Sequence, residues 1–297
     1  MRFTKMTGLG NDYVYIDGFS QTIDNPQQLA IKIADRHFGV GGDGLILVLP
    51  PDEGVEAHTR MRMFNADGSE SEMCGNGIRC VCKLVHDHQL GPDAAQNPMK
   101  IQTGAGVLSL DYKTDAAGKV SSVTVDMGTP VLAPADVPVK ADHLVETGQP
   151  QTFKLNAPGT TERFEATFVS MGNPHAVIYR DEVSDDNREE LLAWGKALEH
   201  HEAFPNRMNI HFVEVLAEDE VRVLHWERGS GPTLACGTGA CAVCVAGVLT
   251  GRTARVINAH LPGGDLKLNW TESINPKDGH VFMIGSATEV FTGDWPG

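Results

Sequence analysis

The alternation of apolar and polar residues predicts short strands joined by tight turns along much of this chain. Residues 2–18 alternate on both sides of a Gly-Asn turn, which is typical of two successive strands. A helix is expected over 25–39, because a proline suits its first turn and Gly39 follows the last apolar positions. Residues 45–49 and 59–68 have the composition of two further strands.

Each half of the chain also contains a helix that begins after a cysteine and several glycines. These helices are expected after Cys74 and after Cys236, and a strand–turn–strand pattern over 164–179 repeats the pattern of the opening residues. The helix after Cys236 is apolar almost all round, which favours a place inside a sheet. Residues 133–162 are rich in Pro, Thr, Asp and Gly and indicate irregular surface structure.

The two cysteine segments indicate a duplicated domain. Cys74-Gly75-Asn76-Gly77 and Cys236-Gly237-Thr238-Gly239 lie 162 positions apart (236 − 74). A single offset that also holds elsewhere is the mark of an internal repeat. The other pairs at this offset are Gly10 and Gly172, Asn11 and Asn173, Ile16 and Ile178, Arg60 and Arg222, and Cys82 and Cys244.

The repeat divides the chain into two expected domains. The C-terminal EVFTG resembles VTVDMG, the strand that opens the second half, so the last strand is expected to return and complete the first domain. We therefore predict one domain from residues 1–118 with 286–297, which carries Cys74, and another from 119–285, which carries Cys236.

Composition and charge narrow the class of protein. The 297 residues are 41% hydrophobic and 21% charged, as in ordinary globular enzymes, and the net charge is −15. Such an acidic chain argues against nucleic acid or an anionic membrane surface as the main partner. No signal-peptide pattern or membrane-length apolar run is present, and six cysteines in so long a chain favour reduced thiols, so a cytoplasmic protein is expected.

A cysteine at a helix N-terminus is suited to acid–base chemistry. The free N–H groups there bind anions and lower a thiol pKa, and the neighbouring glycines let a ligand approach the backbone. Taken alone, either segment would more often be a buried structural cysteine beside a turn. Because both copies retain the thiol, we predict that Cys74 and Cys236 face each other across an interdomain cleft. That arrangement removes a proton from one face of a carbon and returns one to the other.

We predict structural roles for the remaining four cysteines and for the glycine-rich residues 39–44. Cys80, Cys82, Cys241 and Cys244 fall within the helices and are expected in the core, so no metal site is predicted. Residues 39–44 match the G-x-G-x-x-G dinucleotide fingerprint, but they follow a helix and precede a strand, the reverse of the required order. We expect a turn there.

Several polar residues are candidates for the cleft. Asn11 and Asn173 stand in matched Gly-Asn turns, where they either supply turn geometry or contact a ligand. Asn65 and Glu227 each lie nine residues before their cysteine (74 − 65; 236 − 227), and Arg228 adds a cation. His175 is a further candidate, as a partner of a thiol.

With these motifs the chain resembles the diaminopimelate epimerase family over nearly its whole length. The resemblance rests on GLGNDYVYIDG, RHFGVGGDG, FNADGSESEMCGNGIRC, MGNPHAVIY, PNRMNIHFVEV, ERGSGPTLACGTGACAV and LPGGDL, in family order. It implies an α+β fold of two pseudo-symmetric domains, each a curved, mostly antiparallel sheet or barrel around a central helix, with the active site in the cleft between them. It also implies a homodimer and a cofactor-independent epimerase that converts LL- and meso-diaminopimelate in lysine and cell-wall precursor synthesis.

The resemblance assigns roles by position. Cys74 would be the thiolate base and Cys236 the thiol acid, with His175 and Glu227 tuning them. Backbone donors to the carboxylate at the reacting carbon would come from Gly75, Asn76, Gly237 and Thr238. The other substrate groups would be held by Asn11, Asn65, Asn173, Asn209, Glu227 and Arg228.

The chain departs from the family pattern at two positions, and two alternative functions remain. Many family members have Gln where this chain has Gly44, and the dimer-contact tyrosine near the C-terminus is Phe291 here. A proline or hydroxyproline racemase would use the same thiol chemistry, although the polar set suits a second amino-acid head group better. A cysteine-rich metal-binding protein is the alternative from another class.

Overall fold

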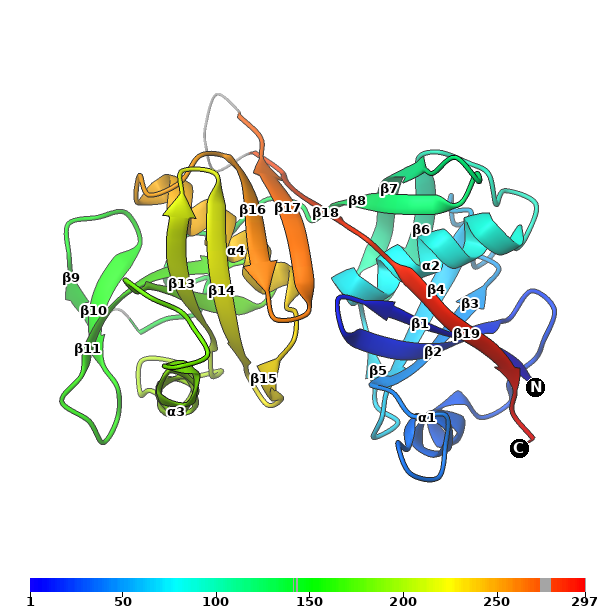
Figure 1. The fold of residues 1–297 in the computed structure, drawn as a ribbon, viewed down its shortest axis with the longest axis horizontal. Helices are drawn as coiled ribbons and strands as arrows, with labels where there is room; N and C mark the ends of the chain where they lie inside the picture. The colour runs from blue at the N-terminus through cyan, green and yellow to red at the C-terminus, as the bar shows by residue number, and fades with distance from the viewer. Residues whose placement is uncertain (141, 143, 273–278, 297) are drawn as a thin grey trace. The chain divides into compact units, whose positions relative to one another are not determined.

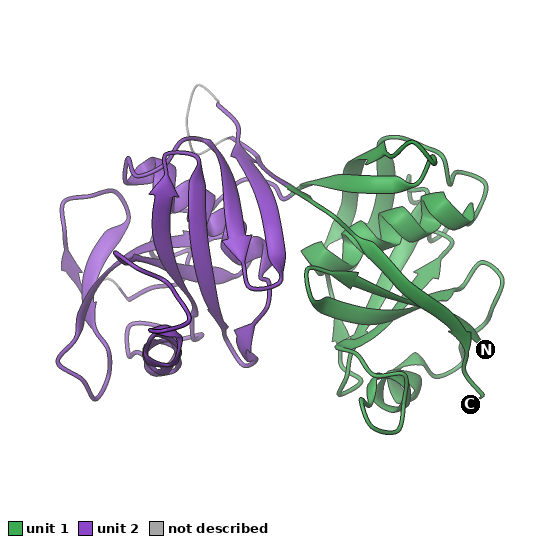
Figure 2. Ribbon diagram, viewed as in Figure 1, with its two compact units in different colours: residues 1–126, 284–297 green, residues 127–283 purple. Residues whose placement is uncertain are grey.

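The computed structural model describes residues 1–140, 142, 144–272 and 279–296 and divides into two compact units (Figure 2). Unit 1 comprises Met1–Asp126 with Ile284–Gly297, and unit 2 comprises Met127–Met283. The first boundary falls later than the sequence predicted, because residues 120–126 form a strand that pairs within unit 1.

Unit 1 is a curved mixed sheet in which most neighbours are antiparallel (Figure 1). Its strands run in the order β19-β1-β2-β3-β4-β6-β7-β8, with the pairs β2–β3 and β4–β6 parallel. The C-terminal strand pairs antiparallel with the first, so both ends of the chain belong to this unit. The strands are β1 (Arg2–Gly8), β2 (Asn11–Asp17), β3 (Gly44–Leu49), β4 (Thr59–Asn65), β5 (Glu70–Ser71), β6 (Met99–Thr103), β7 (Gly106–Thr114), β8 (Val120–Asp126) and β19 (Thr288–Asp294).

Two helices occupy different sides of this sheet. The central helix α2 (Gly75–His88) contacts β1 to β4, β6 to β8 and β19, and its apolar residues are buried. The shorter α1 (Pro26–Ala34) packs against β2, β3 and β4. Its N-cap Asn25 accepts a hydrogen bond from the Gln28 N–H, and the helix ends five residues before the glycine that was expected to stop it (39 − 34).

From β11 to β17, unit 2 repeats the topology that unit 1 has from β1 to β7. An antiparallel pair β11–β12 leads through a helix to a parallel partner β13, then antiparallel β14, and after a second helix parallel β16 and antiparallel β17. The predicted duplication is confirmed at the level of strand pairing. The strands are β9 (Val145–Glu146), β10 (Thr152–Asn156), β11 (Arg163–Ser170), β12 (Pro174–Tyr179), β13 (Asn209–Ala217), β14 (Glu220–Glu227), β15 (Gly231–Thr233), β16 (Val256–Leu261) and β17 (Gly264–Trp270). The boundary between the units falls within β18 (Val281–Gly285).

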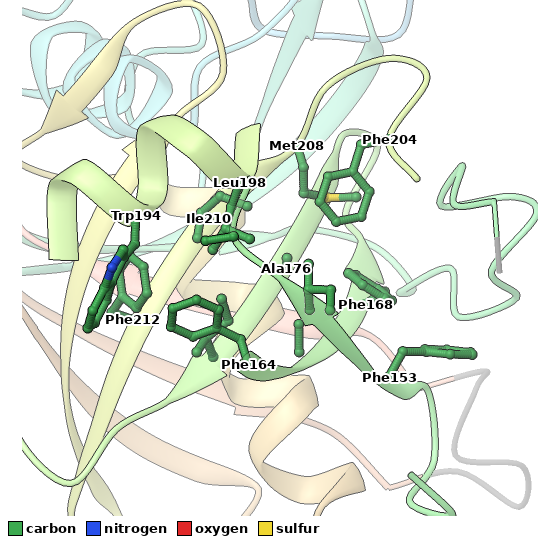
Figure 3. Close-up of a cluster of buried hydrophobic side chains, with 14 of the residues drawn as sticks. Phe153, Phe164, Phe168, Ala176, Trp194, Leu198, Phe204, Met208, Ile210 and Phe212 are labelled. Atoms are coloured by element: carbon green, nitrogen blue, oxygen red, sulfur yellow. The ribbon is translucent and has the colours of Figure 1, made fainter. Parts of the chain in front are cut away.

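The sheet of unit 2 buries a core on each face. On one face α3 (Arg188–Glu199) packs against β13 and β14, and an aromatic cluster that includes Phe164, Phe168 and Phe212 fills the space beneath it (Figure 3). On the other face lies α4 (Gly237–Leu249), whose small apolar residues are nearly all buried, as its uniform hydrophobicity predicted.

The stretch 133–162 differs from the expectation of irregular surface. It contains β9 and β10, and it buries Val137, Phe153 and Leu155 in the aromatic core. The alternation in Thr152–Asn156 is only five residues long and stands between turn-forming residues, so composition concealed it. Among the described residues, no helix is long and apolar enough to cross a membrane.

Candidate active site

Cys74 occupies the N-cap of α2 in unit 1. Its backbone is extended (φ −138°), and its Sγ accepts a hydrogen bond from the Gly77 N–H at 3.4 Å. The thiol is half-buried and donates to Oδ1 of Asn11 at 3.2 Å. The sulfur therefore lies beside the free N–H groups of a helix end and still has access to solvent.

Asn11 is held in place by a charged network behind it. Its Nδ2 donates to Asp43 Oδ2 at 2.7 Å, and Arg36 bridges the carboxylates of Asp43 and Asp12. Lys5 is buried and pairs with Asp12 at 2.5 Å. Burial raises the pKa of Asp12, but the hydrogen bonds from Arg36 and Lys5 outweigh it and the pKa is lowered. These four residues were not predicted from the sequence, in which their only signal is their place beside the two glycine turns.

The first turn of α2 uses its side chains inside unit 1. Asn76 is buried, and its Oδ1 accepts a hydrogen bond from the fully buried Arg79 at 3.0 Å. A second Arg79 nitrogen donates to the Gly75 carbonyl at 3.1 Å. Asn76 is therefore suited to offer a ligand its backbone N–H and not its amide. Asn65, at the end of β4, is half-buried and donates to Ser69 Oγ at 3.0 Å.

Gly44 leaves no room for a side chain. A Cβ there would lie 2.0 Å from the Phe64 carbonyl oxygen, well inside contact distance. The backbone of this unit is thus built for glycine at residue 44, where the family resemblance led us to expect Gln.

Cys236 occupies the corresponding N-cap of α4 in unit 2 and is almost completely buried. Its thiol lies 3.7 Å from the Thr238 hydroxyl and is hydrogen-bonded to the Glu227 carboxyl group. Glu227 also accepts a hydrogen bond from the Thr233 hydroxyl at 2.5 Å. The carboxyl group and the thiol therefore form one hydrogen-bonded unit.

The electrostatics at Cys236 differ from the expected lowering of a thiol pKa. Burial raises the pKa of this thiol well above its usual range, and the Glu227 charge raises it further, although Thr238 and Gly239 act in the opposite direction. Burial also raises the pKa of Glu227. The helix N-terminus is outweighed because the sulfur is removed from water beside a carboxylate. Cys236 is therefore a protonated thiol at neutral pH.

The ring nitrogens of His175, which was expected to be a partner of a thiol, are hydrogen-bonded to other groups. Its Nε2 is bonded to Asn173 Oδ1 at 2.8 Å and its Nδ1 to His211 Nε2 at 2.8 Å, so both ring nitrogens are occupied. His211 continues to His225 at 2.7 Å. His211 and His225 were not predicted as site residues, because isolated histidines on three different strands give no local signal in the sequence.

Asn209 lies behind the Glu227–Arg228 turn. It is buried, its Nδ2 donates to the Pro174 carbonyl at 2.7 Å, and its Oδ1 accepts from the Arg228 N–H at 3.0 Å. The exposed Arg228 side chain donates to the Asn206 carbonyl at 3.0 Å. Asn209 thus ties Arg228 to the start of β12.

Comparison with known proteins decides the family. The family model described as diaminopimelate epimerase matches residues 3–133 and 167–290. The chain belongs to the diaminopimelate epimerase family. It is 48% identical to a diaminopimelate epimerase of Desulfovibrio desulfuricans over 99% of this chain and 98% of that one. It is 46% identical to one of Agathobacter rectalis over 99% of each chain.

Solved structures outside the diaminopimelate epimerases share the fold. A hydroxyproline epimerase from Agrobacterium vitis matches with a TM-score of 0.67 and 14% identity, over 99% of this chain and 91% of that chain. A PhzF-family phenazine biosynthesis protein from Bacillus anthracis matches with a TM-score of 0.63 and 14% identity, over 99% and 98%. The predicted two-domain α+β class is confirmed.

The other cysteines of this family member lie in the cores of the units. The structure confirms that all four are buried, and burial raises the pKa of Cys80 to about 11 and that of Cys82 to about 12. Across the described ranges, no group of three or more His, Cys, Asp or Glu side chains is arranged to hold a metal ion. The four are Cys80, Cys82, Cys241 and Cys244.

Proposed function

We propose that this protein interconverts LL- and meso-diaminopimelate by a cofactor-independent, two-thiol mechanism that serves lysine and cell-wall precursor synthesis. One observation carries the mechanism: each of two duplicated units presents a cysteine as the N-cap of its sheet-wrapped helix. The near full-length identity to named diaminopimelate epimerases supports the substrate.

In the proposed reaction the two thiols act on opposite faces of one α-carbon. The Cys74 thiolate takes the α-proton, and the resulting carbanion takes a proton from the Cys236 thiol, which leaves Cys236 as thiolate and inverts the centre. The reverse direction exchanges the roles. The raised pKa of Cys236 supports its role as the acid, because the group that donates must enter the cycle protonated.

Glu227 is proposed to act through its hydrogen bond to Cys236. A carboxylate that accepts from the thiol holds the S–H proton in a fixed direction and disfavours its loss to water. His175 is proposed to act on Asn173 and not on a thiol, since both its ring nitrogens are already bonded.

The helix N-termini are proposed to bind the α-carboxylate of the substrate. Free N–H groups and the helix dipole make such ends natural anion sites, and they stabilise charge that develops on the carboxylate as the α-proton leaves. The donors would be the backbone N–H groups of Gly75, Asn76, Gly237 and Thr238.

The distal ammonium and carboxylate of the substrate are proposed to bind a set of polar side chains. Arg228 would bind the carboxylate and Glu227 the ammonium, with amide contacts from Asn11, Asn65 and Asn173. Asn209 is proposed to position Arg228, because its amide is buried and already bonded to the backbone of the arginine.

The deciding experiment is exchange of the substrate α-hydrogen in D₂O by purified protein without added cofactor. Deuterium should enter the α-position of diaminopimelate as the LL and meso forms interconvert, and lysine and proline should not exchange. Turnover of proline at the same rate would favour the proline racemase alternative instead. Activity that requires an added metal or cofactor would contradict the two-thiol mechanism.

We further propose that the protein is a cytoplasmic homodimer that pairs through the outer side of β19. Val290 and Phe291 on this strand are about half exposed, and Phe291 stacks edge-on against Phe3. Sedimentation should show a dimer that Phe291→Glu converts to a monomer, whereas a monomeric wild type would contradict the proposal.

A further inference from the structure

Three histidines form a continuous hydrogen-bonded chain inside unit 2. They lie on the neighbouring strands β12, β13 and β14, and each is fully buried: His175, His211 and His225. The nitrogens are 2.8 Å apart at the first junction and 2.7 Å apart at the second. His211 lies against Gly239 in the first turn of α4, three residues after Cys236, where a Cβ would come within 2.4 Å of its Cε1.

Counting protons along this chain fixes the tautomer of each ring. Asn173 Oδ1 accepts, so His175 carries its proton on Nε2 and presents a bare Nδ1 to His211. His211 must then donate from Nε2, and its bare Nδ1 accepts from Nδ1–H of His225. His225 Nε2 is left without a proton, and in the described part of the chain it has no hydrogen-bond partner.

The rings are neutral because nothing among the described residues compensates a charge on them. Their hydrogen bonds run only to one another and to the Asn173 amide, and no carboxylate is bonded to any ring nitrogen. A buried imidazolium without a counter-charge is strongly disfavoured.

The corresponding strand positions of unit 1 show whether the fold itself requires the three histidines. In β3–β4, Ile46 lies opposite Met63 as His211 lies opposite His225 in β13–β14. The repeat offset of 162 relates Met63 to His225 (225 − 63) and Tyr13 to His175 (175 − 13). All three unit 1 residues are buried, so the same scaffold folds with no imidazole at these places.

We propose that His211 and His225 are positioning residues that hold His175 in its Nε2–H tautomer and thereby fix the direction of the Asn173 amide. With Oδ1 turned inward to His175, the Nδ2 of Asn173 faces away from the ring. Asn173 is half-buried, and no hydrogen bond to its Nδ2 is present in the described structure. Two N–H donors are thus presented to a ligand acceptor.

This inference rests on the proposed function for its ligand, a substrate carboxylate. A carboxylate only accepts hydrogen bonds, so it binds the amide in this direction and is repelled by the opposite one. If the proton order of the three rings reversed, His175 Nε2 would accept from Nδ2 and the Asn173 oxygen would face the carboxylate. The histidine chain therefore selects an acceptor at this subsite.

The first test is the tautomer of each ring in the wild-type protein without substrate. Long-range ¹H–¹⁵N correlation spectra of histidine-labelled protein at neutral pH should show the Nε2–H form for His175 and His211 and the Nδ1–H form for His225. An Nδ1–H or cationic His175 would overturn the inference. This result does not depend on which substrate the protein uses.

The second test replaces the middle ring in two ways. His211→Gln keeps one donor and one acceptor, whereas His211→Ile installs the residue that unit 1 has at this place and removes both. We expect His211→Ile to raise KM for diaminopimelate about tenfold with kcat nearly unchanged, as for one hydrogen bond to a charged group, and His211→Gln to stay within about threefold of wild type.

Two outcomes would contradict the inference in this second test. Equal KM values for the Gln and Ile variants would show that hydrogen bonding at this position does not matter, and a loss confined to kcat would indicate a role in the chemical step.

A third variant tests the last ring of the chain. His225→Met, which also copies unit 1, should leave the protein folded and let His211 populate both tautomers in the spectra. A single unchanged His211 tautomer in that variant would show that His225 does not set the order. If wild type fails to epimerise diaminopimelate while the spectra are as expected, the proposed function fails and the tautomer assignment stands.

Discussion

At the scale of single residues, the two cysteines have different surroundings in spite of their equivalent positions. Cys74 is half-buried beside an amide, whereas Cys236 is buried beside a carboxyl group. The proposed two-thiol reaction needs one thiolate and one thiol at the start of each turnover, and equal environments would give neither thiol a preferred role.

Replacement of either cysteine is expected to abolish epimerisation. Inversion needs a base on one face of the α-carbon and an acid on the other, so Cys74→Ala and Cys236→Ala each remove an essential proton carrier. The measurement is interconversion of the LL and meso forms by chiral chromatography. Turnover close to wild type in either variant would contradict the two-thiol mechanism, and Cys80→Ala, which alters a buried core thiol, is the matched control.

Glu227→Gln is expected to lower the pKa of the Cys236 thiol. The Glu227 charge contributes to the raised value, and an uncharged amide removes that contribution while keeping the shape of the side chain. The alkaline limb of the kcat profile should therefore move to lower pH. Ultraviolet titration of thiolate in a Cys74→Ala background would measure the change directly, and an unchanged or raised thiol pKa would count against the assignment.

Arg228→Ala is expected to impair binding of the distal carboxylate. A hydrogen bond to a charged group contributes about 1.5–3 kcal/mol, so kcat/KM for diaminopimelate should fall about tenfold to a hundredfold. Exchange of the α-hydrogen at saturating substrate should remain near the wild-type rate. Arg207→Ala, at a nearby exposed arginine that pairs with Glu199, serves as the control.

At the scale of elements, the glycines three residues after each cysteine have unequal neighbours. A Cβ at Gly239 would come within 2.4 Å of His211 Cε1, whose ring is held on both sides by hydrogen bonds. A Cβ at Gly77 would meet the Ile46 Cδ1 methyl at 2.9 Å, the end of a side chain that can rotate away.

Gly239→Ala is therefore expected to destabilise the protein more than Gly77→Ala. Overpacking a rigid site costs about 1–3 kcal/mol. Alanine is favoured over glycine inside a helix by about 1 kcal/mol, which offsets the milder contact at Gly77. Urea denaturation of both variants would give the difference in the free energy of unfolding. Equal decreases in the free energy of unfolding would show that the His211 ring can move aside as readily as the Ile46 side chain.

Elements were more predictable from the sequence than the contacts between them. Alternation and turn residues located the strands around Asn11 and Asn173 and both cysteine-capped helices, because these signals are local. The histidine chain could not be predicted, since its members come from three strands and acquire partners only through strand register. The raised pKa of Cys236 was missed for the same reason: the helix N-terminus is visible in sequence, whereas burial beside Glu227 is not.

At the scale of the whole molecule, the duplication explains how one fold carries two different half-sites. The pairings of β1 to β4 in unit 1 match those of β11 to β14 in unit 2, and each unit has a cysteine-capped helix, so the backbone is a shared frame. Where unit 2 has its three buried histidines, unit 1 has Tyr13, Ile46 and Met63 at the corresponding strand positions. Side-chain differences on one frame thus give the asymmetry that a one-base, one-acid reaction requires.

The buried histidines are expected to make stability depend steeply on pH below neutrality. Burial lowers the pKa of His175 and of His225 from 6.5 to about 3, and lowers that of His211 in the same direction. The unfolded chain therefore binds protons that the folded protein does not, so their contribution to stability is complete above about pH 6.5 and is lost as the pH falls toward 3.

Within that window, each such histidine steepens the pH dependence of the free energy of unfolding by about 1.4 kcal/mol per pH unit. His225→Met removes one of them, so its free energy of unfolding should fall less steeply than that of wild type by about this amount. Urea denaturation of both proteins at a series of pH values below neutrality measures the two slopes. Carboxylates titrate alike in both proteins and cancel in the comparison. Parallel lines would mean that His225 is protonated in the folded protein, which contradicts a neutral histidine chain.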